Sequence, residues 1–356
     1  MEADRDRAAI AREPDLPGAG QAPAQGAFAG PGAVAAAPPR SAPPAEGPIR
    51  LVAVDLDGVV WLGGTVLPDA PAALADVVRR GLDLRYVSNN STAHRETVSE
   101  RLDAGGLPAG ADRVLTSGYV AARWLRHRLP EGTPVLVVGE AGLLRELSDA
   151  GLAPVHVDEE ATAEPGTGPA AAAAPPALAS ARQGPASAAP APPRHFFAVV
   201  VGMDRGFTFG ALARAQAAVL AGALFVGTNP DPTFPTPDGL LPGAGAVIAA
   251  VATAAQQEPV FMGKPGMALA ETLAAVTGVP PAETLFIGDR LSTDMGMGRR
   301  AGMITALVLT GVTSPADLER AREEGSPDLP DHVLTTLADL PALLDALVAG
   351  ASSPAD

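Results

Sequence analysis

The chain of 356 residues contains no cysteine. Disulfides, thiolate metal sites and cysteine nucleophiles are therefore excluded. Aromatic residues are also scarce, at 4% of the chain, although hydrophobic residues as a whole make up 47%. Valine, leucine, isoleucine and alanine must therefore fill the core, and the length suffices for one large domain or two ordinary ones.

Positive charge is in short supply as well. Only 25 lysines and arginines stand against 40 aspartates and glutamates, which gives a formal net charge of −15. An acidic surface repels phosphate backbones and anionic lipid heads, so we expect neither nucleic acid nor membrane as a partner. The same field opposes any anionic small substrate, which would have to be captured by local positive charge.

Long apolar runs are absent too. No stretch approaches about 18 consecutive apolar residues without glycine or proline, which argues against a transmembrane helix. The opening segment MEADRDRAAIAREPDLPG carries acids and lacks the apolar region of a signal peptide. We therefore expect a cytoplasmic protein.

Two tracts show no hydrophobic periodicity. Residues 1–48 are rich in alanine, proline and glycine, and we predict a disordered tail there. Residues 162–194 have a similar composition, which predicts a flexible surface insertion. Strand patterns resume directly afterwards, so the insertion interrupts an ordered region without ending it.

Between these tracts, short apolar runs alternate with helical patterns, which is typical of an α/β fold. Helices are predicted at residues 71–80 and 93–104, and another begins at Ser314. The predicted strands are residues 49–54, 82–87, 135–138, 196–201, 224–227, 284–287 and 305–309. The late runs are continuously apolar, as buried strands of a parallel sheet should be.

An acidic pair, Asp55 and Asp57, directly follows the first predicted strand in the sequence LVAVDLDG. Strand alternation points both carboxylates the same way, and two like charges this close favour a shared cation. A hard divalent ion such as Mg²⁺ suits such oxygen ligands. The alternative is a turn that merely favours aspartate and glycine.

Two further segments suit a phosphoryl group. The sequence SNNST at residues 88–92 offers a hydroxyl, amides and free backbone N–H groups before a helix. An ordinary helix cap is the alternative there. Lys264 follows the run PVFM, where it could neutralise a phosphoryl group or simply face solvent.

A second acidic pair, Asp289 and Asp294, follows the strand TLFI. These carboxylates could complete an oxygen shell around Mg²⁺, or could only cap the next helix. All four segments follow predicted strands, and ligands bind at the carboxyl ends of strands in open parallel sheets.

In their order, the four segments are similar to the four motifs of the haloacid dehalogenase superfamily. The extended forms VDLDGVVW, VSNNSTAHRETVSERL, MGKPGMALAE and FIGDRLSTDMGMGRRAGM resemble one branch of it. That branch contains the bacterial NagD proteins, the 4-nitrophenylphosphatases and the mammalian phosphoglycolate and pyridoxal phosphate phosphatases. The resemblance covers about residues 49–345, apart from the insertion.

The spacing of the motifs fits the same branch. Ser88 follows Asp57 by only 31 positions (88 − 57), whereas Lys264 follows Thr92 by 172 (264 − 92). A cap domain must therefore be inserted in the longer interval. We predict a Rossmann-like core of the haloacid dehalogenase type at residues 49–130 and 259–349, and an inserted α/β cap of the C2 type at residues 131–258.

The resemblance implies a Mg²⁺-dependent phosphatase that acts on small phosphorylated metabolites. Asp55 would be the nucleophile that becomes an aspartyl phosphate, and Asp57 the general acid and base. Lys264 would contact the transferring phosphoryl oxygens. Lys264 would also bind the substrate, together with three residues of the SNNST segment, which are Ser88, Asn89 and Asn90.

The resemblance also assigns the metal ligands. Asp55, the backbone carbonyl of Asp57 and Asp289 would hold Mg²⁺ directly. Asp294 would instead hold a water molecule bound to the metal. An acid at position 57 separates phosphatases and phosphomutases from dehalogenases, and the missing space between the first two motifs favours a phosphatase.

In the predicted cap, the sequence TNPDPTFP resembles the specificity loop of this branch. We predict Asn229 and Phe234 as substrate-binding residues on that basis. Pyridoxal phosphate phosphatases have histidine where Phe234 lies, which puts that substrate in doubt. Phe234 would either pack against a small organic group or belong to the core.

Some alternatives stay open. The same fold could serve a catalytically weak protein that binds phosphometabolites or acts as a scaffold. Phosphoglycolate, nucleotide monophosphates, sugar phosphates and the artificial 4-nitrophenyl phosphate are all candidate substrates. Relatives in this branch often form homodimers through the cap, so that partner is implied too.

Overall fold

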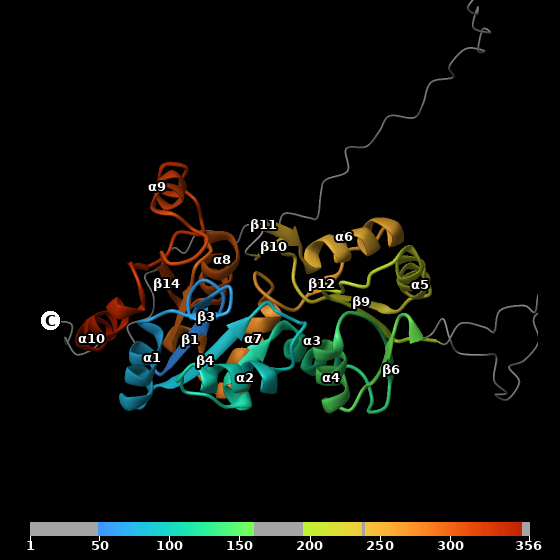
Figure 1. The fold of residues 1–356 in the computed structure, drawn as a ribbon, viewed down its shortest axis with the longest axis horizontal. Helices are drawn as coiled ribbons and strands as arrows, with labels where there is room; N and C mark the ends of the chain where they lie inside the picture. The colour runs from blue at the N-terminus through green and yellow to red at the C-terminus, as the bar shows by residue number, and fades with distance from the viewer. Residues whose placement is uncertain (1–48, 160–194, 237–238, 351–356) are drawn as a thin grey trace, which may run out of the picture. The chain divides into compact units, whose positions relative to one another are not determined.

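The structure is a computed structural model that describes residues 49–159, 195–236 and 239–350. The predicted disordered tail at 1–48 and the predicted insertion at 162–194 lie outside these residues. The described chain is an α/β fold with two parallel sheets (Figure 1).

The first sheet has six parallel strands in the order β15-β14-β13-β1-β4-β5. Their bounds are β1 (Leu51–Asp55), β4 (Asp83–Ser88), β5 (Val114–Thr116), β13 (Thr284–Gly288), β14 (Ile304–Val308) and β15 (His332–Leu334). The expected strands at 49–54, 82–87, 284–287 and 305–309 all belong to it. Because the strands are parallel, the polar residues that follow β1, β4 and β13 meet at one edge of the sheet.

Helices cover both faces of this sheet, and the alternation within β1 shows how. Val52 and Val54 pack into the apolar cluster formed with α1, α2 and α10, whereas Leu51 and Ala53 face the cluster formed with α3, α7 and α8. The helices are α1 (Ala70–Arg79), α2 (Arg95–Ala104), α3 (Ser117–Arg126), α7 (Met267–Thr277), α8 (Gly296–Ala301), α9 (Pro315–Glu323) and α10 (Leu340–Gly350). Helix α9 begins after Ser314, whose side chain forms a capping box with Asp317, as expected at this position.

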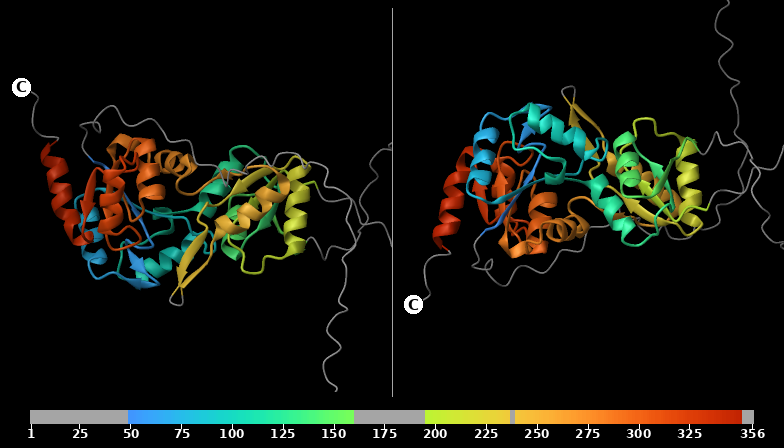
Figure 2. Two further views of the ribbon diagram at one scale, coloured as in Figure 1. Left: turned by 90° about the horizontal axis from the view of Figure 1, so that it is seen from above. Right: turned by 90° about the horizontal axis from the view of Figure 1, so that it is seen from below.

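The second sheet has five parallel strands in the order β12-β9-β8-β6-β7. Their bounds are β6 (Pro134–Val138), β7 (Ala153–His156), β8 (Ala198–Val201), β9 (Leu224–Gly227) and β12 (Val260–Phe261). Helix α4 (Ala141–Asp149) covers one face, and α5 (Phe209–Leu220) and α6 (Ala244–Ala255) cover the other (Figures 1 and 2). Strand β12 thus extends this sheet past residue 258, where we placed the end of the cap.

Two small antiparallel hairpins lie near the edge of the first sheet where the polar residues after β1, β4 and β13 meet. One joins β2 (Trp61–Leu62) to β3 (Thr65–Val66), and the other joins β10 (Thr233–Thr236) to β11 (Gly239–Pro242). Short helical turns lie at Ala111–Arg113, Pro281–Glu283, Leu291–Met295 and Leu337–Asp339. Among the described residues, no helix has both the length and the apolar character that crossing a membrane requires.

Candidate active site

Asp55 ends the central strand β1 and lies at the floor of the site, with only 7% of its surface exposed. Its Oδ1 accepts a hydrogen bond from the backbone N–H of Leu56 at 2.8 Å and lies 2.7 Å from Nζ of Lys264. Burial raises the pKa of the Asp55 carboxyl well above its ordinary value, although the ammonium of Lys264 acts in the opposite direction. Among the described residues, its Oδ2 has no hydrogen-bond partner, so this oxygen is the one available for chemistry.

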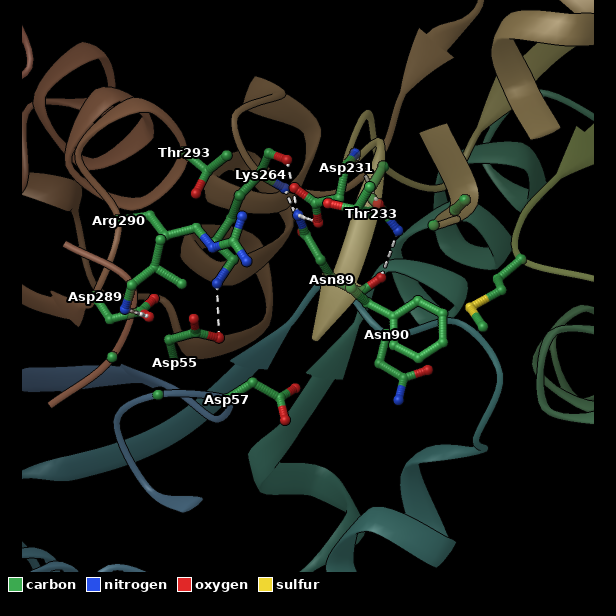
Figure 3. A pocket seen from close by; sticks show the side chains of 18 of the residues that line it. Asp55, Asp57, Asn89, Asn90, Asp231, Thr233, Lys264, Asp289, Arg290 and Thr293 are labelled. Carbon is green, nitrogen blue, oxygen red and sulfur yellow. Dashed lines mark hydrogen bonds and ion pairs between the residues drawn. The ribbon is translucent and has the colours of Figure 1, made fainter. Parts of the chain in front are cut away.

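Lys264 lies three residues before α7 and is 3% exposed. Its Nζ lies between two carboxylates, 2.7 Å from Asp55, as Figure 3 shows, and 2.8 Å from Asp294. Burial alone lowers the pKa of Lys264, but the charges of Asp294 and Asp55 outweigh it and hold the pKa above its ordinary value. The lysine is therefore a fixed positive charge, and the alternative of a solvent-facing lysine is wrong.

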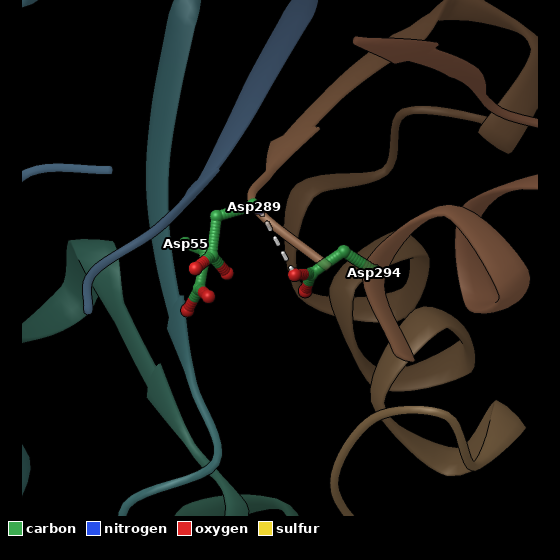
Figure 4. A group of neighbouring side chains, drawn as sticks. All are labelled: Asp55, Asp289 and Asp294. Carbon is green, nitrogen blue, oxygen red and sulfur yellow. Dashed lines mark hydrogen bonds between the residues drawn. The ribbon is translucent and has the colours of Figure 1, made fainter. Parts of the chain in front are cut away.

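Three buried carboxylates, those of Asp55, Asp289 and Asp294, converge so that one oxygen of each lies within 4.8 Å of the others (Figure 4). Asp294 is already engaged, because its Oδ2 accepts from the backbone N–H groups of Asp289 and Arg290 and its Oδ1 faces Lys264. Asp289 differs, because its Oδ2 accepts from Val312 N–H whereas its buried Oδ1 has no hydrogen-bond partner among the described residues. Such an oxygen is costly to bury unless a cation binds it.

The surroundings of Asp289 fit a small divalent cation. A Cβ at Gly58 or Gly311 would come within 2.3 or 2.0 Å of its Oδ2, so only glycine lets both loops approach the carboxylate. Burial and the charge of Asp294 raise the pKa of Asp289 to about 7. All the atoms that could ligate a metal in this acidic group are carboxylate oxygens, which Mg²⁺ prefers as ligands.

The carboxylate of Asp57 points away from this acidic group and is exposed (Figure 3). Its Oδ1 accepts a hydrogen bond from the indole Nε1 of Trp61 at 2.8 Å. Gly58 has a φ of +88°, and this left-handed turn lets the chain reverse between β1 and β2. The predicted role of the Asp57 backbone carbonyl as a metal ligand stays a prediction.

In the loop after β4, the three residues that we predicted to bind phosphate have different hydrogen-bond partners. Ser88 is buried and its hydroxyl accepts from Asn90 N–H at 3.1 Å. The amide of Asn89 is fully used within the protein: it accepts from Lys264 N–H at 2.8 Å and donates to Lys264 O at 3.0 Å and to Asp231 Oδ2 at 2.9 Å. Asn89 and Asn90 both line the cavity, but Asn89 fixes the lysine loop, whereas Asn90 accepts only local hydrogen bonds from Thr92 at 2.8 Å.

The two residues predicted from the cap also differ in their surroundings. Asn229 is buried, donates to Asn89 O at 2.7 Å and accepts from Asp231 N–H at 3.1 Å, so it joins β9 to the loop after β4. Phe234, in β10, lines the cavity and is half-buried.

A cavity of about 420 Å³ brings these segments together. It was not foreseen that Trp61, Arg205, Asp231, Arg290 and Thr293 would line it. Arg205 forms an ion pair with Glu140 at 2.7 Å, whereas Arg290 has no carboxylate within ion-pair distance among the described residues. The sequence could have indicated two of these residues only through their position beside a motif. Trp61 follows DLDGVV, and Arg290 follows GD.

Comparison with known proteins agrees with this arrangement. A family model described as haloacid dehalogenase-like hydrolase matches residues 52–153, and an HAD-hydrolase-like model matches residues 261–340. A glycerol-3-phosphate phosphatase of Gallus gallus is 38% identical over 300 residues, which cover 82% of this chain and 91% of that protein. The chain belongs to the haloacid dehalogenase-like hydrolase family.

Solved structures of this family extend the likeness. A p-nitrophenyl phosphatase from Archaeoglobus fulgidus superposes with a TM-score of 0.69 at 29% identity and covers 84% of this chain and 100% of its own. A glycerol phosphate phosphatase from Mycobacterium tuberculosis, solved in complex with magnesium, gives 0.66 at 31% identity, covering 82% and 76%. The predicted haloacid dehalogenase fold with a Rossmann-like core and an inserted cap is confirmed, and this family member is a phosphoric monoester hydrolase.

Proposed function

We propose that this phosphatase uses Mg²⁺ and hydrolyses small phosphorylated metabolites through a phosphorylated Asp55. The observation that carries the proposal is the polarised environment of Asp55. One oxygen is held by Lys264, the other is free, and the unpartnered Oδ1 of Asp289 lies in the same acidic group. A carboxylate held in this way presents a single oxygen for in-line attack.

The first step forms a bond between Asp55 Oδ2 and phosphorus and breaks the bond between phosphorus and the ester oxygen. Asp57 gives its proton to the departing oxygen. In the second step water attacks the aspartyl phosphate, Asp57 takes a proton from that water, and inorganic phosphate leaves with Asp55 restored. Lys264 and the N–H groups of the loop after β4 stabilise the oxygens of the transferring group.

Asp55, the backbone carbonyl of Asp57 and Asp289 would hold the metal, with Asp294 fixing Asp289 and Lys264 around it. When bound, Mg²⁺ offsets the negative charge of the phosphoryl oxygens. Asn90 and Phe234 would face the organic part of the substrate, whereas Asn89 and Asn229 would act by holding the loops in place.

The size of the cavity, about 420 Å³, favours compact phosphate monoesters. The relatives named for glycerol phosphate and p-nitrophenyl phosphate support that class. The cytoplasmic location, the homodimer through the cap and the exclusion of nucleic acid and membrane partners stay predictions.

The test is phosphate release from glycerol-3-phosphate and from 4-nitrophenyl phosphate, with Mg²⁺ or with EDTA. We expect release that requires the metal and that disappears in Asp55→Asn, whose amide is isosteric but cannot form the acyl phosphate. Release from both esters that persists in EDTA would reject the Mg²⁺ requirement, and full activity in Asp55→Asn would reject the nucleophile.

A further inference from the structure

The carboxylate of Asp57 is exposed, yet it is held at one oxygen. Trp61 Nε1 donates to Asp57 Oδ1 at 2.8 Å, while Asp57 Oδ2 has no hydrogen bond to any described residue. The turn that joins them is tight, because Gly58 N–H donates to Trp61 O at 2.8 Å and Trp61 N–H donates to Leu56 O at 3.1 Å. The indole is 3% exposed, so its position is set by packing.

A cation holds the other side of this indole. The guanidinium carbon of Arg101, from α2, lies 4.0 Å from the centroid of the Trp61 ring. No carboxylate lies within ion-pair distance of Arg101 among the residues that the structure describes, although the chain is strongly acidic. Gly64 in the β2–β3 turn leaves room for the guanidinium, because a Cβ there would lie 3.1 Å from Arg101 Nη2.

These contacts form a line from Arg101 through Trp61 to Asp57. A cation over an aromatic face is attracted to the ring, and the electron density that it draws makes the N–H a stronger donor. A hydrogen bond from that N–H to a charged acceptor is stronger than one between neutral groups. The contact fixes Oδ1 and leaves Oδ2 to carry the proton.

We propose that Trp61 and Arg101 are positioning residues that hold the carboxylate of Asp57 for proton transfer to the leaving group. Arg101 is absent from the cavity lining, so it acts through Trp61. This inference rests on the proposed role of Asp57 as general acid and base.

The test compares kcat/KM for phenyl phosphate and 4-nitrophenyl phosphate, which are similar in shape. Phenolate is the poorer leaving group and needs the proton more, and kcat/KM reports the steps up to formation of the phosphoenzyme. The variants are Trp61→Phe, Arg101→Met, Arg101→Lys, Asp57→Asn and the double variant of Trp61→Phe with Asp57→Asn. Arg128→Met is the matched control, because Arg128 stacks on Trp124 at 3.7 Å outside the cavity lining.

We expect Trp61→Phe to raise the preference for 4-nitrophenyl phosphate by about tenfold, the effect of one charged hydrogen bond. Arg101→Met should raise it by about threefold, as loss of a cation–π contact implies. Arg101→Lys, which keeps the cation, and Arg128→Met should leave the preference unchanged. In the Asp57→Asn background, Trp61→Phe should add nothing.

Two results would overturn the inference and leave the proposed function standing: an unchanged preference in a folded Trp61→Phe variant while Asp57→Asn shifts it, or a further shift in the double variant. If Arg101→Met kept the substrate preference of the unmodified protein while Trp61→Phe shifted it, the role assigned to Arg101 would be rejected. An unchanged preference in Asp57→Asn itself would instead reject the acid role of Asp57.

Discussion

Lys264 is the only lysine in the chain, and its Nζ is buried between two carboxylates. Because its pKa is held above its ordinary value, it should carry almost no neutral amine at about pH 9, where ordinary lysines begin to react. We expect an amine acetylating reagent to leave Lys264 unmodified in the native protein and to modify it after unfolding in urea. Peptide mass spectrometry reads this directly, and equal acetylation in both states would contradict the burial.

Asp289 gives the site a pH dependence whose sign can be worked out. Its pKa of about 7 in the folded protein exceeds the value near 4 of an unfolded chain. The group therefore favours the folded state most below about pH 4, and that contribution is lost as the pH rises to about 7. A metal binds the ionised form, so its affinity should rise up to about pH 7 and then level off.

We accordingly expect Mg²⁺ to raise the melting temperature more at about pH 8 than at about pH 6. Thermal unfolding with Mg²⁺ or EDTA at both values measures this, and Asp289→Asn should abolish the difference. A Mg²⁺ effect equal at both pH values would contradict the assignment of Asp289 as a ligand.

At the scale of elements, two loops close around Asp289. Thr310 Oγ1, after β14, donates to Gly58 O, after β1, at 2.6 Å, and Gly311 is in van der Waals range of the carboxylate. Gly311→Ala would place a Cβ 2.0 Å from Asp289 Oδ2, so the loop or the carboxylate must shift. We expect a loss of about a hundredfold in kcat/KM, as misplacement of a reacting group by about 1 Å implies.

The matched control is Gly210→Ala, in the first turn of α5, where the new Cβ would meet the flexible end of Arg214 at 3.2 Å and make an ordinary contact with Thr208 Oγ1 at 3.6 Å. That variant should keep full activity, and isothermal titration should show weaker Mg²⁺ binding in Gly311→Ala only. If Gly311→Ala bound Mg²⁺ as tightly as the control, the close approach to Asp289 would have no function.

Much of the element pattern could be predicted, because buried parallel strands are continuous apolar runs. Strand β9 matches its expected range of 224–227. Strand β13 is one residue longer than its expected range of 284–287. Strand β12 could not be assigned to a sheet, since a two-residue strand carries no periodicity and its partner β9 is distant in sequence. The β10–β11 hairpin was also not foreseen, because the prolines of TFPTPDGLLP hide any alternation.

Within the site, sequence order was enough to predict the edge at which Asp55, Asp57 and Asp289 gather, because parallel strands end together. Side-chain contacts between residues far apart in the sequence could not be predicted. Asn89 meets Asp231 across 142 positions and Lys264 across 175, and these bonds turn an expected phosphate ligand into a residue that holds two loops. Trp61 beside Asp57 depends on a tight turn that composition does not reveal.

At the scale of the whole molecule, a net charge of −15 opposes an anionic substrate, and the cavity itself is lined by four carboxylates and three cations. Lys264 lies at the floor of the cavity, and Arg205 and Arg290 line it. Arg290 has no ion-pair partner among the described residues, so its charge is available to a ligand. The local positive charge that composition led us to expect is therefore, among the described residues, that of Arg290 together with the buried Lys264.

The central claim is that Asp55 becomes phosphorylated during turnover. The most direct measurement is the mass of the intact protein, quenched in acid during turnover of 4-nitrophenyl phosphate with Mg²⁺, followed by peptide mapping. The account predicts a phosphoryl adduct on Asp55 that hydroxylamine removes and that Asp55→Asn lacks. Turnover without any adduct, or an adduct that persists in Asp55→Asn, would contradict it.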